Sequence, residues 1–383
     1  MDVPEVGIDW RAKGFWRPDG GPAPVGESLF GGGFTWPVLT LRRSAVEHNI
    51  ATMAAFAARH GLELAPHMKT SMAPGLIAAQ LAAGAWACTV ATAHQALVLR
   101  RLGAPRVLLA NLLLDPAALG WLAREIEAGF DAYLQVDSVE GVEAASRAAR
   151  SAPVPVLVEL GHDGGRTGAR GLDRLRAVAD AAAEAPGTRF AGVTGYEGGA
   201  ADVPGFLDDL VAAAHATGAG IVSAGGSAWF DVVAEKLSHA PEGSLRVLRS
   251  GAYVTHDDGY YREHTPFARI AGELRPALAV WAQVLSTPEP GLAIVGMGKR
   301  DAPFDEGLPE PQVIRRAGVL RSADGLVVTR LQDQHCYVEG SGLRIGDLVR
   351  FGISHPCTAF DKWRALPVVD DDDVVRDVLE TYF

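Results

Sequence analysis

The sequence predicts an α/β protein, a (β/α)₈ barrel of the TIM type with a C-terminal antiparallel β domain. Between residues 62 and 250, short apolar runs alternate with Ala- and Arg-rich amphipathic stretches. After about residue 270, segments of alternating apolar and polar residues are separated by turn-forming residues. Eight alternating β and α units are the number that closes a barrel, and an open doubly wound sheet is the alternative.

Each apolar run is short and rich in Val and Leu, as expected for a strand buried on both faces. The predicted barrel strands cover residues 62–67, 85–90, 106–111, 131–136, 154–160, 190–196, 220–224 and 245–250. The stretches between them, such as residues 46–60 and 171–185, have the spacing of amphipathic helices.

The predicted β domain contains the alternating segments 278–286, 292–298, 318–331 and 343–354. A further run, residues 36–41, would be a ninth barrel strand, so we assign it to the β domain. The expected organisation is an N-terminal segment (1–43) that contributes to the β domain, a barrel (44–270) and the β domain itself (271–383).

The composition excludes several classes of protein. The formal net charge of −11 leaves no basic surface typical of nucleic-acid binding. No apolar run approaches the roughly 18 residues of a membrane span, and the N-terminal residues do not resemble a secretory signal. Three scattered cysteines do not suggest a disulfide framework. We expect a cytoplasmic protein that acts on small molecules.

Residues just after the barrel strands deserve the most attention, because the active face of a barrel is at the carboxyl ends of its strands. Lys69 follows the first run, and a lysine held among apolar neighbours can react as a neutral amine with an aldehyde. An ordinary surface lysine is the alternative. Arg166, in the loop after the fifth run, and Tyr196, after the sixth, occupy equivalent places. Arg166 could instead cap a helix or bind a carboxylate, and Tyr196 could be a core residue.

Glycine-rich loops follow the last two strands. The sequences are Ala-Gly-Gly-Ser (224–227) and Arg-Ser-Gly-Ala-Tyr (249–253). Glycines let backbone N–H groups approach a phosphate closely, and these are the loops in which barrels most often bind one.

His355 and Cys357 lie two residues apart near the C-terminus. If this segment is an extended strand, both side chains point to one side and can bind one metal ion. Two protein ligands leave positions open for a substrate, which is typical of a catalytic site and not of a structural one. Asp361 and His335 are candidates for a further ligand or a supporting contact.

Together these motifs resemble the pyridoxal 5'-phosphate (PLP) enzymes of the alanine racemase-like fold (fold-type III), and among them the D-serine dehydratase and D-threonine aldolase family. The motifs are Pro-His-Met-Lys-Thr (66–70), Gly-Gly-Arg-Thr-Gly (164–168), the two glycine loops, and His-Pro-Cys-Thr-Ala-Phe-Asp-Lys-Trp (355–363).

The resemblance implies a role for each motif. Lys69 would carry PLP and act in catalysis, and Arg166 would approach the phenolic oxygen of the cofactor. Either Arg249 or Tyr196 would face the pyridine nitrogen. The phosphate would be held by the loops that contain Gly225, Gly226, Ser227, Ser250, Gly251, Ala252 and Tyr253. His355 and Cys357 would bind a divalent metal, and the thiolate favours zinc.

The expected function is that of a PLP- and metal-dependent lyase acting on D-3-hydroxy amino acids. Dehydration to a 2-oxo acid and ammonia is the first hypothesis, because His-x-Cys marks the zinc-dependent dehydratases of this family. Retro-aldol cleavage to glycine and an aldehyde is the alternative. A non-catalytic PLP-binding protein and a plain racemase are further alternatives, although neither needs a metal. The resemblance also implies a homodimer.

Overall fold

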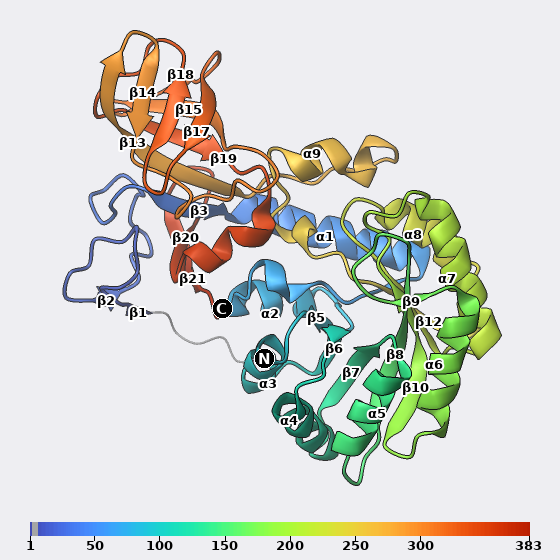
Figure 1. Cartoon of the computed structure of the whole chain (residues 1–383). Helices are drawn as coiled ribbons and strands as arrows, with labels where there is room; N and C mark the ends of the chain where they lie inside the picture. The colour runs from blue at the N-terminus through green and yellow to red at the C-terminus, as the bar shows by residue number, and fades with distance from the viewer. Residues whose placement is uncertain (2–6) are drawn as a thin grey trace. The chain divides into compact units, whose positions relative to one another are not determined.

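The computed structural model describes residue 1 and residues 7–383. Residues 2–6 lie outside the described residues. They are part of the predicted N-terminal segment and of the N-terminal stretch that does not resemble a secretory signal. The chain forms two compact units (Figure 1). The first comprises Met53–Lys69 and Ile77–Gly251. The second comprises residues 7–52, Thr70–Leu76 and Ala252–Phe383. The boundary falls inside α1 (Arg43–His60) and α2 (Pro74–Ala82).

The first unit is the predicted barrel, and all eight predicted strands are present. They are β4 (Glu63–Leu64), β5 (Cys88–Val90), β6 (Arg106–Leu112), β7 (Asp131–Val136), β8 (Val154–Gly161), β10 (Thr188–Gly195), β11 (Ile221–Ala224) and β12 (Leu245–Leu248). Neighbouring strands pair in parallel in the order β4-β12-β11-β10-β8-β7-β6-β5, and the two-residue strand β9 (Ala169–Arg170) pairs with β8. Trp86 N–H donates to Leu64 O at 2.7 Å and Thr89 N–H to Pro66 O at 2.9 Å, which joins β4 to β5 and closes the barrel.

Four of six helices between the barrel strands begin at a residue whose side chain caps them. The six helices are α3 (Ala93–Arg101), α4 (Pro116–Glu127), α5 (Val139–Ala148), α6 (Leu172–Glu184), α7 (Val203–Thr217) and α8 (Phe230–Leu237). The side chains of Thr92, Asp115, Ser138 and Asp202 each accept a hydrogen bond from a backbone N–H in the first turn of the helix that follows. Such caps satisfy donors that have no partner within the helix.

The barrel interior is packed with side chains. One buried cluster contains Leu108, Leu157 and Val247 from three of the strands, together with Ala65, Ala87, Ala191 and Ile221. The interior is therefore a filled core and not a pore.

The second unit is built on a mainly antiparallel sheet, as predicted for the region after residue 270. Its strands are β3 (Val38–Arg42), β13 (Leu278–Glu289), β14 (Leu292–Val295), β15 (Glu310–Arg316), β16 (Val319–Ser322), β17 (Val327–Leu331), β18 (Cys336–Glu339), β19 (Leu348–Gly352), β20 (Ala365–Val369) and β21 (Val375–Glu380). The strand from the 36–41 run, β3, pairs with β13 in antiparallel and with β20 in parallel. A separate pair of short strands, β1 (Gly7–Ile8) and β2 (Gly21–Pro22), lies near the N-terminus.

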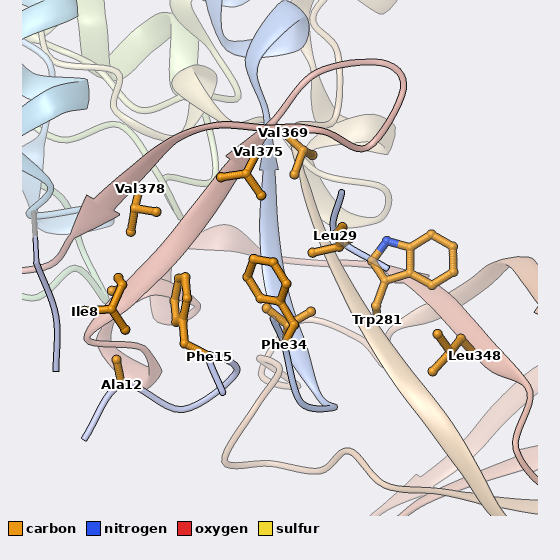
Figure 2. Packing of buried hydrophobic residues seen from close by; sticks show 12 residues of the cluster. Ile8, Ala12, Phe15, Leu29, Phe34, Trp281, Leu348, Val369, Val375 and Val378 are labelled. Atoms are coloured by element: carbon orange, nitrogen blue, oxygen red, sulfur yellow. The ribbon is translucent and has the colours of Figure 1, made fainter. Parts of the chain in front are cut away.

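Residues from both ends of the chain form one hydrophobic core in this unit (Figure 2). Phe15, Leu29 and Phe34 of the N-terminal segment are buried with Trp281 of β13 and Val375 of β21. The ring of Phe30 meets the ring of Trp281 edge to face, with centroids 5.0 Å apart. The N-terminal segment therefore belongs to the core of the second unit.

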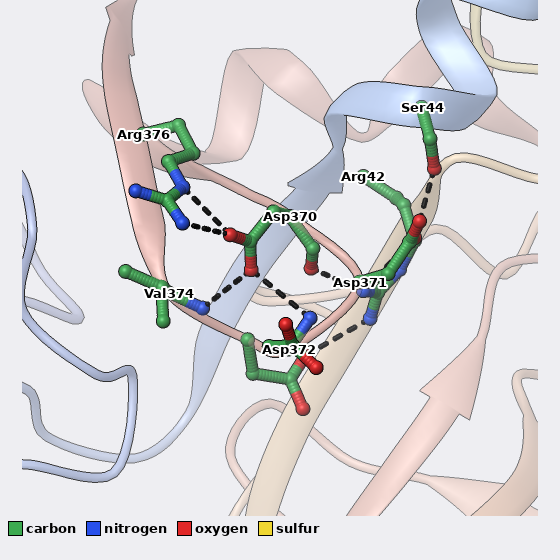
Figure 3. A network of polar contacts seen from close by, with 8 residues as sticks. Arg42, Ser44, Asp370, Asp371, Asp372, Val374 and Arg376 are labelled. Carbon is green, nitrogen blue, oxygen red and sulfur yellow. Dashed lines mark hydrogen bonds and ion pairs between the residues drawn. The ribbon is translucent and has the colours of Figure 1, made fainter.

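The acidic run near the C-terminus has a structural role (Figure 3). Arg42 donates to the backbone oxygen of Asp370 and pairs with Asp373 at 2.9 Å. The Asp370 carboxylate accepts hydrogen bonds from Val374 N–H at 2.9 Å and from Arg376 Nε at 2.6 Å. These contacts hold the turn between β20 and β21, the hairpin that carries the end of the chain.

Candidate active site and metal centre

Lys69 lies at the carboxyl end of the first barrel strand, within a short 3₁₀ turn (η1, Met68–Thr70). The two preceding residues, Pro66 and His67, continue the direction of the strand, and His67 forms a parallel bridge with Thr89 of β5. The backbone of Gly251 passes so close to His67 that a Cβ on this glycine would overlap the His67 carbonyl oxygen. A glycine is therefore required for the loop after β12 to approach the lysine segment.

Three cations surround His67. Burial holds the pKa of His67 well below its usual value, and the charges of Lys69, Arg249 and Arg166 lower it further. Its Nδ1 atom is buried without a hydrogen-bond partner among the described residues. A neutral histidine amid three cations indicates a local positive potential in a chain whose net charge is −11, which favours an anionic ligand.

Arg166 and Tyr196 lie together at the carboxyl ends of β8 and β10. The guanidinium carbon of Arg166 is 4.9 Å from the centre of the Tyr196 ring, within the range of a cation–π contact. Both residues line a cavity of about 350 Å³, together with Glu159 of β8. Tyr196 is 38% exposed, so it is not the core residue that the sequence left open as an alternative.

Arg249 is buried and fully engaged with neighbouring strands. One terminal nitrogen donates to Thr194 Oγ1 at 2.7 Å and to Ser223 Oγ at 2.6 Å, and the other donates to Gly195 O at 2.7 Å. Burial lowers the pKa of Arg249, while the charge of Glu197 is the largest of the influences that raise it. The guanidinium thus fastens the end of β12 to β10 and β11.

The glycine loop after β11 already binds an anionic group within the protein. Gly225 and Gly226 donate their N–H groups to the carboxylate of Glu197 at 3.0 and 2.6 Å. Glu197 has no solvent exposure, and burial raises its pKa while the two amides and Arg249 act in the opposite direction. The sequence did not indicate this contact, because Glu197 follows Tyr196 directly and has no motif of its own that points to the glycine loop.

The remaining predicted phosphate contacts divide between the units. Ser227 lies in the turn before α8, and Ser250 Oγ donates to Gly226 O at 3.0 Å, so that the two glycine loops of the barrel are joined. Ala252 and Tyr253 begin a buried 3₁₀ turn (η2, Ala252–Val254) that belongs to the second unit.

His355 and Cys357 are in contact, but not on an extended strand. His355 caps a 3₁₀ turn (η4, Pro356–Thr358), so the expectation of strand geometry is wrong. Pro356 at the first position of the turn fixes a backbone angle that suits it. The two side chains nevertheless share a hydrogen bond, because one tight turn brings residues i and i+2 together. The sulfur of Cys357 is also 3.9 Å from Thr70 Oγ1.

A carboxylate that the sequence did not suggest completes this cluster. Asp305 accepts a hydrogen bond from His355 Nδ1 at 2.7 Å, from a position 50 residues earlier in the chain. Burial lowers the pKa of His355, but contact with Cys357 and Asp305 outweighs it and raises this pKa to about 9. Asp361 and His335, the candidates named from the sequence, are exposed. Among the described residues, neither forms a hydrogen bond or an ion pair with His355 or Cys357.

The second unit holds a further buried acid, Asp257, whose pKa burial raises to about 7 while the charge of His355 is among the effects that lower it. Asp257 Oδ1 accepts hydrogen bonds from the backbone N–H groups of Gly259 at 3.0 Å and Tyr261 at 2.8 Å, whereas its buried Oδ2 has no partner among the described residues.

Within residue 1 and residues 7–383, no set of three or more His, Cys, Asp or Glu side chains is arranged to hold a metal ion.

The barrel residues fit PLP. The lysine at the first strand, the cluster of cations around His67 and the cavity beside Arg166 and Tyr196 suit an aldehyde cofactor with an anionic phosphate. The close approach at Gly251 brings the backbone of the loop after β12 next to the lysine segment, whereas the amides of Gly225 and Gly226 are already used by the carboxylate of Glu197.

Comparisons with known proteins agree with this geometry. Residues 41–227 match the alanine racemase N-terminal domain family, and residues 277–369 match the serine dehydratase domain family. The chain therefore combines a barrel similar to the alanine racemase N-terminal domain with a domain similar to those of serine dehydratases. Its relatives are aldolases and dehydratases, and the chain is a PLP-dependent lyase of the aldolase or dehydratase type.

Individual relatives cover nearly the whole chain. A D-threonine aldolase of Arthrobacter sp is 28% identical over 374 residues, which are 90% of this chain and 91% of the relative. The crystal structure of D-threonine aldolase from Filomicrobium marinum is 25% identical, with a TM-score of 0.82 over 94% of this chain and 98% of that chain. D-threo-3-hydroxyaspartate dehydratase from Delftia sp. HT23, at 24% identity and a TM-score of 0.73, shares the fold over 91% of this chain and 97% of that chain.

The part of the chain that the structure describes contains no helix with both the length and the apolar character to cross a bilayer.

Proposed function

We propose that the protein is a PLP- and metal-dependent dehydratase of D-3-hydroxy amino acids, which converts D-serine or D-threonine to a 2-oxo acid and ammonia. The observation that carries this proposal is the contact between His355 and Cys357, with Asp305 hydrogen-bonded to the imidazole. A histidine paired with a thiolate suits zinc, and a carboxylate behind the imidazole orients it as a ligand.

The barrel residues have separate tasks. Lys69 would hold the cofactor and, as a free amine, would take the proton from Cα of the substrate. Tyr196 would lie beside the pyridine nitrogen and Arg166 beside the phenolic oxygen. The engagement of Arg249 with Thr194, Ser223 and Gly195 supports this choice of Tyr196, because three of the five N–H donors of Arg249 are already in use within the barrel. Bound PLP supplies an electron sink for the electron pair left on Cα.

The hydroxyl group at Cβ sets the need for a metal. Hydroxide is a poor leaving group at neutral pH, so elimination requires a Lewis acid or a proton donor at that oxygen. A divalent metal held by His355 and Cys357, most simply zinc, supplies the Lewis acid. Asp305, which accepts a hydrogen bond from His355 Nδ1, would hold the imidazole in place as a ligand.

The phosphate of PLP is proposed to bind at the glycine loops after β11 and β12. Because the N–H groups of Gly225 and Gly226 donate to Glu197, the carboxylate sets the shape of the first loop. Ser227, Ser250 and Gly251 then provide donors beside it, with Ala252 and Tyr253 next along the chain.

Retro-aldol cleavage to glycine and an aldehyde is the second candidate, and the likeness to D-threonine aldolases favours it. A metal serves this reaction also, because cleavage needs an alkoxide at the same oxygen. The two reactions give different products from one substrate.

The deciding experiment is incubation of the purified holoenzyme with D-serine and with D-threonine, each with and without a chelator. A dehydratase gives pyruvate or 2-oxobutanoate and equimolar ammonia, and the chelator stops the reaction. Glycine and acetaldehyde from D-threonine would establish the aldolase instead. No turnover of either compound would refute both, and would favour a PLP-binding protein without this activity.

We further propose that the enzyme is a homodimer and lies in the cytoplasm. Both follow by analogy with the family.

A further inference from the structure

The second unit contains a cavity of about 680 Å³ that the proposed reaction does not use. Four basic residues line it, Lys13, Lys299, Arg300 and Lys362, from three separate parts of the chain, and the one acidic residue in its lining is Asp301. In a chain with 46 acidic and 35 basic residues, such a gathering of cations is unusual. We call this cavity the Lys13 pocket.

Asp301 is already occupied by contacts within the protein. Its buried carboxylate pairs with Lys13 at 2.8 Å and accepts bonds from Gly298 N–H at 3.0 Å and Gln334 at 3.3 Å. Lys13 is further held by the carbonyl oxygen of Arg300 at 2.6 Å. Asp301 therefore neutralises the charge of Lys13. Among the described residues, the lining of the pocket contains no further acidic residue to neutralise the charges of the other three cations.

Those three cations have weak partners among the described residues. Arg300 pairs at 3.3 Å with Asp333, but both side chains are about 70% exposed, and such pairs contribute little. Lys299 lies 5.0 Å from the centre of the Phe304 ring. Within the described part of the chain, the ammonium group of Lys362 forms no hydrogen bond or ion pair.

The cations also repel one another. Burial lowers the pKa of Lys13, and the charges of Lys362 and Arg300 lower it further, against the opposing effect of Asp301. An anion placed among them would relieve this repulsion.

We propose that the Lys13 pocket binds a small organic anion with two or more carboxylate or phosphate groups. Three uncompensated cations match a ligand of two or more negative charges. The volume lies within the range of about 300–1,000 Å³ for small-molecule sites, whereas a single inorganic anion would fill a small part of it. Trp36 and Pro37 in the lining provide apolar contact for a carbon skeleton.

The test is calorimetric titration of the PLP-loaded enzyme at low ionic strength with succinate, fructose 1,6-bisphosphate and inorganic phosphate. Saturation with PLP keeps the phosphate loops of the barrel filled. The first two probes separate carboxylate from phosphate recognition, and the third tests whether a simple ion suffices. Binding is measured for the wild type, for the double variant Lys299→Ala/Lys362→Ala, and for the control Lys236→Ala, whose lysine pairs with Asp208 on the barrel.

We expect at least one organic anion to bind the wild type and Lys236→Ala equally, and its affinity to fall by about tenfold or more in the double variant, because two charge-assisted contacts are removed. Equal binding by the double variant would place the anion elsewhere and overturn the proposal. Binding of inorganic phosphate alone, or of none of the probes, would also overturn it.

Discussion

At the scale of single residues, the candidate site depends on two carboxylates that act through their neighbours. Glu197 accepts the N–H groups of the loop after β11, and Asp305 accepts the imidazole N–H of His355. Neither carboxylate would contact the substrate in the proposed reaction. Glu197 instead holds the loop after β11, and Asp305 holds the imidazole of His355.

The metal prediction concerns Cys357. Replacing Cys357 with Ala removes one of two ligands, so the metal content of the purified protein should fall about tenfold or more, and the activity with it. PLP should stay bound, because Lys69 and the glycine loops after β11 and β12 belong to the barrel. Elemental analysis and the visible absorption of the cofactor measure the two effects.

The control is His335→Ala, which replaces an exposed histidine between β17 and β18 and should leave the metal content unchanged. A Cys357→Ala variant with full activity in chelator would show that the pair is not a metal site.

The second residue prediction concerns Glu197. Glu197→Gln keeps the shape of the side chain but turns one acceptor into a donor, which faces the N–H of Gly225 or Gly226 and breaks one hydrogen bond. We expect the PLP dissociation constant to rise by about tenfold, as the loop loses its support. Titration of the apoenzyme with PLP, followed by absorbance, measures it. Glu235→Gln, on the exposed face of α8, is the control. An unchanged or tighter constant would mean that Glu197 does not support cofactor binding.

Individual residues also show what sequence reasoning depends on. Lys69 was predicted because it follows an apolar run, and His355 and Cys357 because they are two residues apart, and their roles stay predictions. Asp305 was not found, since a partner 50 residues away leaves no local pattern. The 3₁₀ turn at Pro356 was missed for another reason, because spacing alone does not distinguish it from a strand.

At the scale of elements, the barrel strands were predictable because each is an apolar run buried on both faces, as in Val154–Gly161. The details of their pairing were not. The register between β10 and β8 shifts between Phe190 and Gly192, and Gly192 has a φ of +156°. A shift of this kind depends on the neighbouring strand and not on the run itself.

Gly192 carries the prediction for this element. A Cβ at this position would overlap the carbonyl oxygen of Ile221 on β11, so Gly192→Ala must push the two strands apart. We expect a loss of about 2–4 kcal/mol in the free energy of unfolding, seen by chemical denaturation. Gly220→Ala is a matched control, because its Cβ would lie 3.4 Å from the nearest atom, Ala191 O. Equal stability of the two variants would contradict the expected clash.

At the scale of the whole molecule, the stability should depend on pH through buried acids of the second unit. Burial raises the pKa of Asp258 from 3.8 to about 6, with Glu310 adding to the effect and Gln312 and Arg262 opposing it. The folded state thus holds the proton more tightly than the unfolded state. This contribution is complete below about pH 4 and is lost as the pH rises through about 6.

The prediction is a stability difference that grows with pH. Asp258→Asn is neutral at all pH values, so its melting temperature relative to wild type should be higher at pH 7.5 than at pH 4.5. Thermal unfolding at both pH values measures the difference. Asp324→Asn, at an exposed turn, should show no such dependence. A constant difference for Asp258→Asn would rule out this acid as a source of the pH effect.

The oligomeric state is the other prediction at this scale. We expect a homodimer, by analogy with the family, and light scattering at working concentration measures its mass. A mass of one chain, 40.4 kDa, would exclude it.

The pairing of β3 with β13 and β20 has a consequence for how the protein is made. Thr40 on β3 donates a hydrogen bond to the Ala279 carbonyl oxygen, 239 residues further along the chain, and Arg42 pairs with Asp373, 331 residues further. During translation β3 leaves the ribosome long before either partner strand exists. The barrel segments between Met53 and Gly251 emerge in the interval and can fold first, since domains generally fold as units during synthesis. The sheet that contains β3 can be completed only after β13 and β20 have been synthesised.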